Sequence, residues 1–300
     1  MKIKNQSVHD YKSFDPFEYP GEKPRFSFLL EGSMIYPIVI QQNRPLKASR
    51  IWVEETWKEL DDYLKLKSLP QLSERCPIIV YGSLRNPVKL YERFNSNESK
   101  NEYIRRAKIK KTYGIDIIPA FQCLLKEYDV AYMAHASKRG YLPITLVYSP
   151  GTLLPSQVIF LEERQMKIMD ISEGRDRDFY KLIILKTDGV MLENGGILKD
   201  VYVYANTNRV LRVDEQFVRP KNVFVENPQF QSKTQQEILS YILLKYKIIQ
   251  EIAGSKTPQG LSKSFSDEQV VLPKINQFLH GQLSTVVEAL GDEIPFIKLP

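Results

Sequence analysis

Short apolar runs separated by turn residues are the main pattern along the chain. Such runs predict strands, because a half-buried strand needs only a few apolar residues between polar turns. The segment Asn194-Gly195-Gly196 indicates a hairpin, since Asn and Gly tolerate positive φ. The predicted strands lie at 26–48, 77–84, 141–148, 158–160, 179–185 and 200–205, and residues 115–134 fit strands or a short helix. Strands dominate with a helix inserted between them, a pattern that favours an α+β barrel or a curled sheet.

Helices are predicted where apolar residues recur every three or four positions. Two such segments, residues 50–66 and residues 162–170, lie before and after the central strands. Their apolar stripes consist of Val53, Trp57, Leu60 and Leu64 in the first segment and of Met166 and Met169 in the second. Each helix is therefore expected to pack one face against the sheet.

The C-terminal part of the chain changes character and is predicted to be helical. Ser232 and Gln235 form a capping-box pattern, and Gly254 is a typical helix end. The predicted continuation is a polar linker at 255–268 and one or two helices at 270–290, broken near Pro273 and Gly281. The domains predicted from these changes are an N-terminal extension at 1–75 (an arm, strands and a helix), a central domain at 76–215 and a C-terminal helical extension at 216–300.

Composition narrows the class of protein. The chain has 300 residues, of which 43% are hydrophobic, enough for a sizeable core. Its two cysteines, Cys76 and Cys123, cannot build a disulfide framework, and no CxxC spacing is present. This cysteine usage favours a reducing compartment, so a cytoplasmic location is predicted. No apolar run is long enough for a secretory leader or a membrane span, and no membrane partner is expected.

The net charge of +6 permits acidic partners but does not require them. A nucleic-acid binder would need interleaved aromatic residues or a docking motif, and neither accompanies the densest basic run. We therefore interpret this run as a solvated helix or strand face, and binding of nucleic acid is the weakest hypothesis. The run consists of Arg105, Arg106, Lys108, Lys110 and Lys111.

The segment Tyr81-Gly82-Ser83-Leu84 follows a short buried strand and is a candidate binding turn. N–H groups exposed at such a strand end can bind a carboxylate or stabilise a developing oxyanion. Gly82 lacks the Cβ that would block the approach of a ligand. Taken alone, the segment is explained better as a plain exit from a strand.

Glu173 is a candidate acid or base, because it stands between a predicted helix and an aromatic strand and precedes Gly174. A carboxylate at a helix C-terminus lies at the negative end of the helix dipole, which is unfavourable. A merely exposed carboxylate is therefore slightly disfavoured as the explanation of Glu173. Beside a cavity, the same group can accept and return a proton. An exposed helix-end carboxylate and a general base both remain open on this evidence.

Taken together, several segments resemble the γ-glutamylcyclotransferase-like superfamily, which includes the plant AIG2-like proteins. The family order is a YGSL signature, a Ser-Pro-Gly segment, an Asp-x-x-Glu-Gly motif after a helix, and a tyrosine soon after. This chain has Tyr81-Gly82-Ser83-Leu84, Ser149-Pro150-Gly151, Met169-Asp170-Ile171-Ser172-Glu173-Gly174 and Tyr180. The hairpin after Leu185 and the strand Val201-Tyr202-Val203-Tyr204 also fit, and the resemblance covers residues 77–210, under half of the chain.

The resemblance implies a fold and a reaction. The fold would be a small mixed β-barrel with flanking helices, extended here by N-terminal strands and a helix and by a C-terminal helical segment. The reaction would convert a small-molecule γ-glutamyl substrate into 5-oxoproline and an amine or amino acid. The resemblance assigns acid/base catalysis to Glu173, substrate binding to the backbone of Tyr81, Gly82, Ser83 and Leu84, and a pocket wall to Tyr180 or Tyr204.

Several assignments compete with simpler explanations. Packing is the favoured role for Tyr180 and Tyr204. Arg85 could pair with the substrate α-carboxylate, although a surface arginine is the favoured interpretation. Ser83 lacks the G-x-S-x-G pattern of a hydrolase nucleophile. No metal or organic cofactor is expected, because the three histidines His9, His135 and His280 form no ligand motif.

The chain also departs from the family pattern. Ser156 stands where the family often has glycine, Leu182 stands where it often has arginine, and residues 94–101 form a loop-like insertion. These departures leave the leaving group open. The alternative function is a non-catalytic binding module on the same fold, whose C-terminal helices contact a protein partner or a second copy of the chain.

Overall fold

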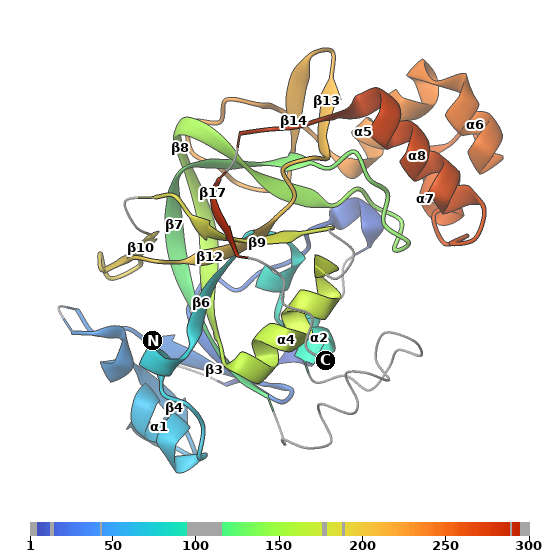
Figure 1. Cartoon of the computed structure of the whole chain (residues 1–300). Coiled ribbons are helices and arrows are strands. Elements are labelled where there is room, and N and C mark those ends of the chain that lie inside the picture. Colours follow the sequence, from blue (N-terminus) through green and yellow to red (C-terminus); the bar gives the residue numbers. More distant parts are fainter. Residues whose placement is uncertain are drawn as a thin grey trace.

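The computed structural model describes residues 5–12, 15–42, 44–94, 116–175, 179–187, 190–288 and 290–294, and its architecture is α+β (Figure 1). The strands are β1 Gln6–Ser7, β2 Phe28–Glu31, β3 Met34–Val39, β4 Arg50–Val53, β5 Thr56–Glu59, β6 Cys76–Val80, β7 Ile117–Tyr132, β8 Ile144–Leu161, β9 Lys181–Leu185, β10 Val190–Leu192, β11 Ile197–Leu198, β12 Tyr202–Ala205, β13 Val210–Val213, β14 Gln216–Pro220, β15 Gln231–Lys233, β16 Ser284–Thr285 and β17 Gly291–Ile294. The α-helices are α1 Leu60–Leu66, α2 Pro87–Phe94, α4 Glu163–Ser172, α5 Gln235–Lys245, α6 Lys247–Ala253, α7 Pro258–Ser264 and α8 Val271–Leu283. Short 3₁₀ helices lie at η1 Val8–Asp10, η2 Pro16–Glu18, η3 Leu46–Ala48, η4 Leu72–Glu74 and η5 Ser83–Arg85. The basic run at 105–111 and residues 95–101 of the predicted insertion lie outside the described residues.

Most strands belong to one large sheet with the order β17-β9-β12-β6-β8-β7-β2-β3-β4-β5. Along this path β6 and β12 are parallel, and the other neighbours are antiparallel. Strand β6 lies between β8 and β12, so both of its edges are hydrogen-bonded. The turn that follows β6 is therefore carried by a strand that is paired on both sides.

The small mixed β-barrel that the resemblance implies is not closed in the described residues, where no pairing joins the two ends of this strand order. One end is β17, a four-residue strand contributed by the C-terminus. The other end is β5, which belongs to the N-terminal part of the chain. These two edge strands come from opposite flanks of the sequence, and each pairs on one side only along the path. The sheet is large and curved, but its order is open.

The β7–β8 pair is longer than predicted, because β8 continues past Ser149-Pro150-Gly151, where the sequence indicated an end. The ladder is interrupted there: Tyr148 pairs with Tyr128, and the pairing resumes between Leu153 and Lys126. The hydroxyl of Thr152 donates to the carbonyl of Ser149 at 2.6 Å and to that of Tyr128 at 3.0 Å. A bulge therefore absorbs the proline and glycine without ending the strand.

Side chains of the central strands alternate between two apolar clusters, as the period of a strand requires. The smaller cluster is covered by α2 and α4, which lie side by side in Figure 1. Its members include Val80, Ala120, Ile159, Leu90 and Ile168, whereas Ile79, Phe121 and Val158 point into the larger cluster. The alternation of side chains along the strands therefore also determines where α2 and α4 pack on the sheet.

The prediction of a single helix over 50–66 is wrong in its first half. Strands β4 and β5 form a hairpin there, with Glu54 and Glu55 at φ of 52° and 61° and with Trp52 opposite Trp57. The helix α1 begins only at Leu60. The apolar spacing that indicates a helix arises here from a strand, a tight turn and a helix start in succession, and Trp57 is 42% exposed.

The C-terminal part forms a group of helices at one side of the molecule (Figure 1). The cap of α5 is Thr234 with Glu237, not Ser232 with Gln235, because β15 extends through residue 233. The predicted helix up to Gly254 is divided at Tyr246 into α5 and α6. The predicted linker contains α7, and α8 passes through Pro273 and Gly281 without a break, since Pro273 lies in its first turn.

Both flanks of the chain add strands to the central sheet. From the N-terminal flank β2 pairs with β7, and from the C-terminal flank β17 pairs with β9. A second sheet, β15-β14-β13-β16, joins the C-terminal helices to this body. The boundaries predicted near residues 75 and 215 stay predictions. In the part of the chain that is described, no helix has the length and apolarity needed to cross a membrane.

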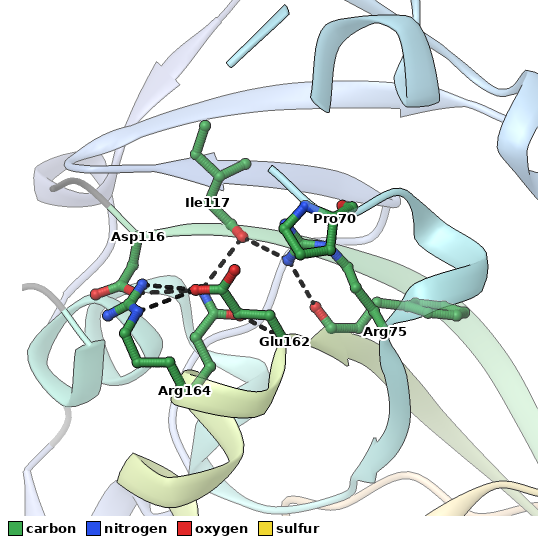
Figure 2. A network of polar contacts seen from close by, with 8 residues as sticks. Pro70, Arg75, Asp116, Ile117, Glu162 and Arg164 are labelled. Atoms are coloured by element: carbon green, nitrogen blue, oxygen red, sulfur yellow. Dashed lines mark hydrogen bonds and ion pairs between the residues drawn. The ribbon is translucent and has the colours of Figure 1, made fainter. Parts of the chain in front are cut away.

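A buried polar network, which we call the α4 N-terminal network, joins the start of α4 to the starts of β6 and β7 (Figure 2). Arg164 forms ion pairs with Asp116 and, at 2.8 Å, with Glu162. Arg75 donates to the carbonyls of Pro70 and Ile117, each at 3.0 Å. The network fixes the position of α4 relative to the sheet, and with it the residue at the far end of that helix.

Candidate active site

A cavity of about 250 Å³ lies where the end of β6, the helices α2 and α4 and the loop after β7 converge. Its wall comes from segments far apart in sequence, so the cavity exists only in the folded chain. The lining residues are Tyr19, Ile79, Val80, Tyr81, Gly82, Ser83, Leu84, Lys89, Glu92, Arg93, Ser137, Lys138, Arg139, Tyr141, Pro143, Ile144, Met169, Ser172, Glu173, Phe179, Tyr180 and Tyr204. The candidate catalytic residue Glu173 and the candidate substrate-binding residues Tyr81, Gly82, Ser83, Leu84 and Tyr180 all belong to this wall, and so does Tyr204.

The turn after β6 lines the cavity with four consecutive residues, 81–84. Tyr81 is buried, and its hydroxyl donates to the carbonyl of Tyr204 at 2.7 Å. In the described residues, the N–H groups of Gly82, Ser83 and Leu84 donate to no acceptor. These three donors can therefore receive a ligand oxygen. A Cβ at Gly82 would lie 3.3 Å from the hydroxyl oxygen of Tyr19, so the glycine keeps this turn from crowding its neighbour.

Glu173 caps the C-terminus of α4, where Gly174 at φ of 69° turns the chain away. Its side chain is 14% exposed and forms an ion pair with Arg93, whose side chain is 18% exposed. Arg93 also donates from Nη1 to Ser172 Oγ at 2.6 Å, and Ser172 donates to the carbonyl of Met169 at 3.0 Å. The carboxylate is thus held at the cavity wall by a cation from α2.

Buried tyrosines form much of the remaining wall. Tyr180 donates to the carbonyl of Ile144 at 3.0 Å, and Tyr204 donates to Asp170 Oδ1 at 2.7 Å. Tyr19 stacks on Tyr141 with 4.2 Å between ring centroids. Burial is the main cause that raises the pKa of Tyr19, Tyr180 and Tyr204 well above the usual value of a phenol, so these side chains serve as neutral donors and apolar walls.

Sequence reasoning missed the cations of the cavity. Lys89, Glu92 and Arg93 follow one another at helical spacing on α2, so one face of this helix is turned to the site. The sequence contained a signal for these residues, because the segment that forms α2 begins shortly after the candidate turn. Lys138 and Arg139 reach the rim from the loop after β7.

Arg85 lies elsewhere than expected. It is only 4% exposed, so the interpretation as a surface arginine is wrong, and it does not line the cavity. Burial lowers the pKa of its guanidinium to about 10. Its position, directly after Leu84 in η5, turns the side chain out of the site and into the body of the protein.

The described residues include no group of three or more His, Cys, Asp or Glu side chains close enough to hold a metal ion. His135 and His280 do meet, with 3.4 Å between Nδ1 and Nε2, but they lie behind the cavity wall, where His135 packs on Phe179. This pair was not foreseen, because the two histidines are far apart in sequence.

Comparisons with known proteins give a limited result. No protein-family profile matches the chain, and no curated protein matches it. Among solved structures, one titled "Gamma-glutamyl cyclotransferase" is similar, with 16% identity, a TM-score of 0.34, and coverage of 45% of this chain and 69% of that one. An uncharacterized protein from Homo sapiens is similar at 17% identity and a TM-score of 0.31, with the same coverage. Likeness at this level carries no argument about activity, so the site is judged on its geometry.

Proposed function

We propose that the protein catalyses the cyclisation of a γ-glutamyl compound, with release of 5-oxoproline and an amine or amino acid. The observation that carries the proposal is that Glu173 and the turn of Gly82, Ser83 and Leu84, whose N–H groups donate to no acceptor in the described residues, line one and the same cavity. A carboxylate and a set of oxyanion donors facing one another are what this reaction needs. The motif order in the sequence supports the same reaction.

The proposed reaction needs no covalent bond between the substrate and the protein. Glu173 takes a proton from the α-ammonium, and the freed amine attacks the γ-carbonyl carbon, which forms the ring C–N bond. The negative charge on the carbonyl oxygen is held by the N–H groups of the 82–84 turn. When the tetrahedral centre collapses, the bond to the leaving nitrogen breaks, and Glu173 returns its proton to that nitrogen. Glu173 then takes the second proton that the ring nitrogen must lose to become an amide, and passes it to the released amine. The carboxylate ends the cycle as it began.

The cavity also supports a small substrate. Its volume of about 250 Å³ lies just below the usual range of ligand pockets, about 300–1,000 Å³. A space of this size suits a γ-glutamyl moiety with the leaving group projecting toward the rim. Holding the amine next to its own carbonyl supplies the proximity on which an intramolecular reaction depends.

One observation favours the alternative, a non-catalytic binding module. On the C-terminal helices, Leu244 is 80% exposed and Ile248 is 45% exposed. An apolar surface there suits a protein partner or a second copy of the chain. This alternative predicts no turnover of any γ-glutamyl compound, which separates it from the enzyme hypothesis.

The test is release of 5-oxoproline, measured by mass spectrometry on a panel of γ-glutamyl amino acids, peptides and amines. Glu173→Gln should lower the rate about 10²–10⁴-fold, because the amide cannot accept the ammonium proton. Glu92→Gln is the matched control: it removes another carboxylate of the same cavity, one that pairs with Lys89 at 2.8 Å. Equal losses in both variants, or no product from the wild-type protein, would refute the proposal.

A further inference from the structure

The chemistry of the substrate places a second charge beside Glu173. In a γ-glutamyl compound the α-carboxylate and the α-amine are bonded to the same carbon. If Glu173 meets the amine, the substrate carboxylate therefore lies within a few ångströms of the Glu173 carboxylate. Two neighbouring carboxylates repel each other unless a cation lies between them or beside them. The site must supply that cation from its wall.

Among the cations of the cavity wall, Arg93 has the position for this role. It contacts Glu173 directly and lies on the same wall. Lys89 is held by Glu92 at 2.8 Å, and Lys138 is 53% exposed and lies 3.5 Å from Glu268. Arg139 is exposed and lies beside Tyr141. Lys89 and Lys138 thus pair with other carboxylates, and of the four cations only Arg93 has an ion pair with Glu173 among the described residues.

Arg93 also has an anchor that does not depend on Glu173. Its Nη1 donates to Ser172 Oγ at 2.6 Å, and that hydroxyl is oriented by its own donation to Met169 at 3.0 Å. The guanidinium can therefore keep its place when one carboxylate partner is replaced by another. Its planar fork matches a carboxylate, which a lysine ammonium does not do in the same way.

We propose that Arg93 binds the α-carboxylate of the γ-glutamyl moiety, and that it exchanges Glu173 for this carboxylate when substrate enters. This inference rests on the proposed function and adds the residue that selects substrates with a free α-carboxylate. In the empty site Arg93 neutralises Glu173. In the occupied site the substrate carboxylate takes over the guanidinium, and Glu173 is free to accept the ammonium proton.

Ligand binding tests the exchange without any need for turnover. The probes are 5-oxoproline, which carries the carboxylate, and 2-pyrrolidinone, which is the same ring without it. Titration calorimetry or ligand-observed NMR should show that the wild-type protein prefers 5-oxoproline about ten- to a hundredfold, the range of a charge-assisted pair. Arg93→Gln should reduce this preference to about the error of the measurement, and Arg93→Lys should retain part of it. Lys138→Gln, a change of another rim cation, should leave it unchanged.

A second variant distinguishes exchange from simple attraction. Glu173→Gln removes the internal competitor for Arg93, so it should bind 5-oxoproline several-fold more tightly than the wild-type protein. Weaker binding in this variant, a preference that survives Arg93→Gln, or no binding of 5-oxoproline at all would overturn the inference. Circular dichroism of each variant reports whether it is folded, and Arg93→Lys serves if Arg93→Gln does not fold.

The outcomes separate this inference from the proposed function. Arg93-dependent binding of 5-oxoproline without turnover of any γ-glutamyl compound would support the inference about Arg93 and refute the proposed enzyme activity. Turnover by the wild-type protein, with a substrate preference that is the same in Arg93→Gln, would support the proposed enzyme activity and refute the inference about Arg93. In that case a γ-glutamyl amide and its 4-aminobutyryl counterpart, which lacks the α-carboxylate, would show similar ratios of kcat/KM in wild type and Arg93→Gln.

Discussion

The two ends of α4 each carry an arginine–carboxylate contact, and the two contacts differ in almost every other respect. At the N-terminal end, Asp116 and Arg164 are 2% and 11% exposed, and the surrounding network bonds to backbone carbonyls (Figure 2). At the C-terminal end, Glu173 and Arg93 are 14% and 18% exposed and face a cavity. The first pair lies inside the protein, and the second is open to a ligand.

The helix dipole divides the two ends further. Negative charge stabilises the start of a helix and destabilises its end. Asp116 and Glu162 at the start of α4 agree with this rule, whereas Glu173 at the end of α4 opposes it. A carboxylate kept where the helix disfavours it, and neutralised by an arginine from another helix, suits a role in binding or catalysis. A carboxylate at the favoured end needs only a structural role.

The largest effect is expected from breaking the buried pair. Asp116→Asn should lower the free energy of unfolding by about 3 kcal/mol, because Arg164 would keep its charge with less compensation in a buried place. Glu173→Gln, the same change of acid to amide at the other end of α4, should cost about 1 kcal/mol or less. Denaturant unfolding of both variants measures the difference. Similar losses at the two ends would contradict this distinction between structural and functional pairs.

A second, smaller effect is expected in the pH dependence of stability, and the residue responsible, His135, lies at neither end of α4. Burial, His280 and Arg209 together lower the pKa of His135 to about 3, and burial also lowers the pKa of His280. In the window between about 6.5 and 3 the unfolded chain takes up a proton at His135 that the folded chain does not. The free energy of unfolding should therefore fall as pH falls through this window, by about 2 kcal/mol at pH 5.

The matched variants locate this acid sensitivity. His135→Gln should flatten the pH dependence of unfolding between about pH 6.5 and 5, because the titrating group is gone. His9→Gln changes an exposed histidine and should leave the dependence as in the wild type. If His135→Gln keeps the full slope, the sensitivity belongs to another group, and His280, whose pKa burial also lowers, becomes the next candidate.

The smallest effect is expected next to the cavity pair. Tyr204→Phe removes the hydroxyl that donates to Asp170 at 2.7 Å, while Arg175 still holds Asp170 at 2.8 Å. With one partner remaining, the free energy of unfolding should fall by only about 1 kcal/mol. A thermal melt measures the change. A loss several times larger would mean that this hydrogen bond, and not the α4 N-terminal network, holds the C-terminal end of α4 in place.

Local patterns were sufficient where neighbours in the chain decide the structure. The hairpin at 194–196 forms between β10 and β11 as predicted, because Asn and Gly adopt the required backbone without help from the rest of the fold. The helix after Leu161 also forms, since its apolar face is visible in the spacing of its residues. The same local approach failed over 50–66, where a strand hairpin and a helix share one apolar spacing.

The cavity depended on contacts between distant segments. Local patterns marked Glu173 and the 81–84 turn separately, and the family resemblance assigned both to one site. The parallel pairing of β6 with β12 and the packing of α4 against α2 bring them to one cavity. Arg93 was not singled out, and Arg85 was considered instead, because the direction of a side chain depends on the helix that carries it. In the folded chain η5 turns Arg85 into the interior and α2 turns Arg93 toward Glu173, a choice made by packing and not by the residues themselves.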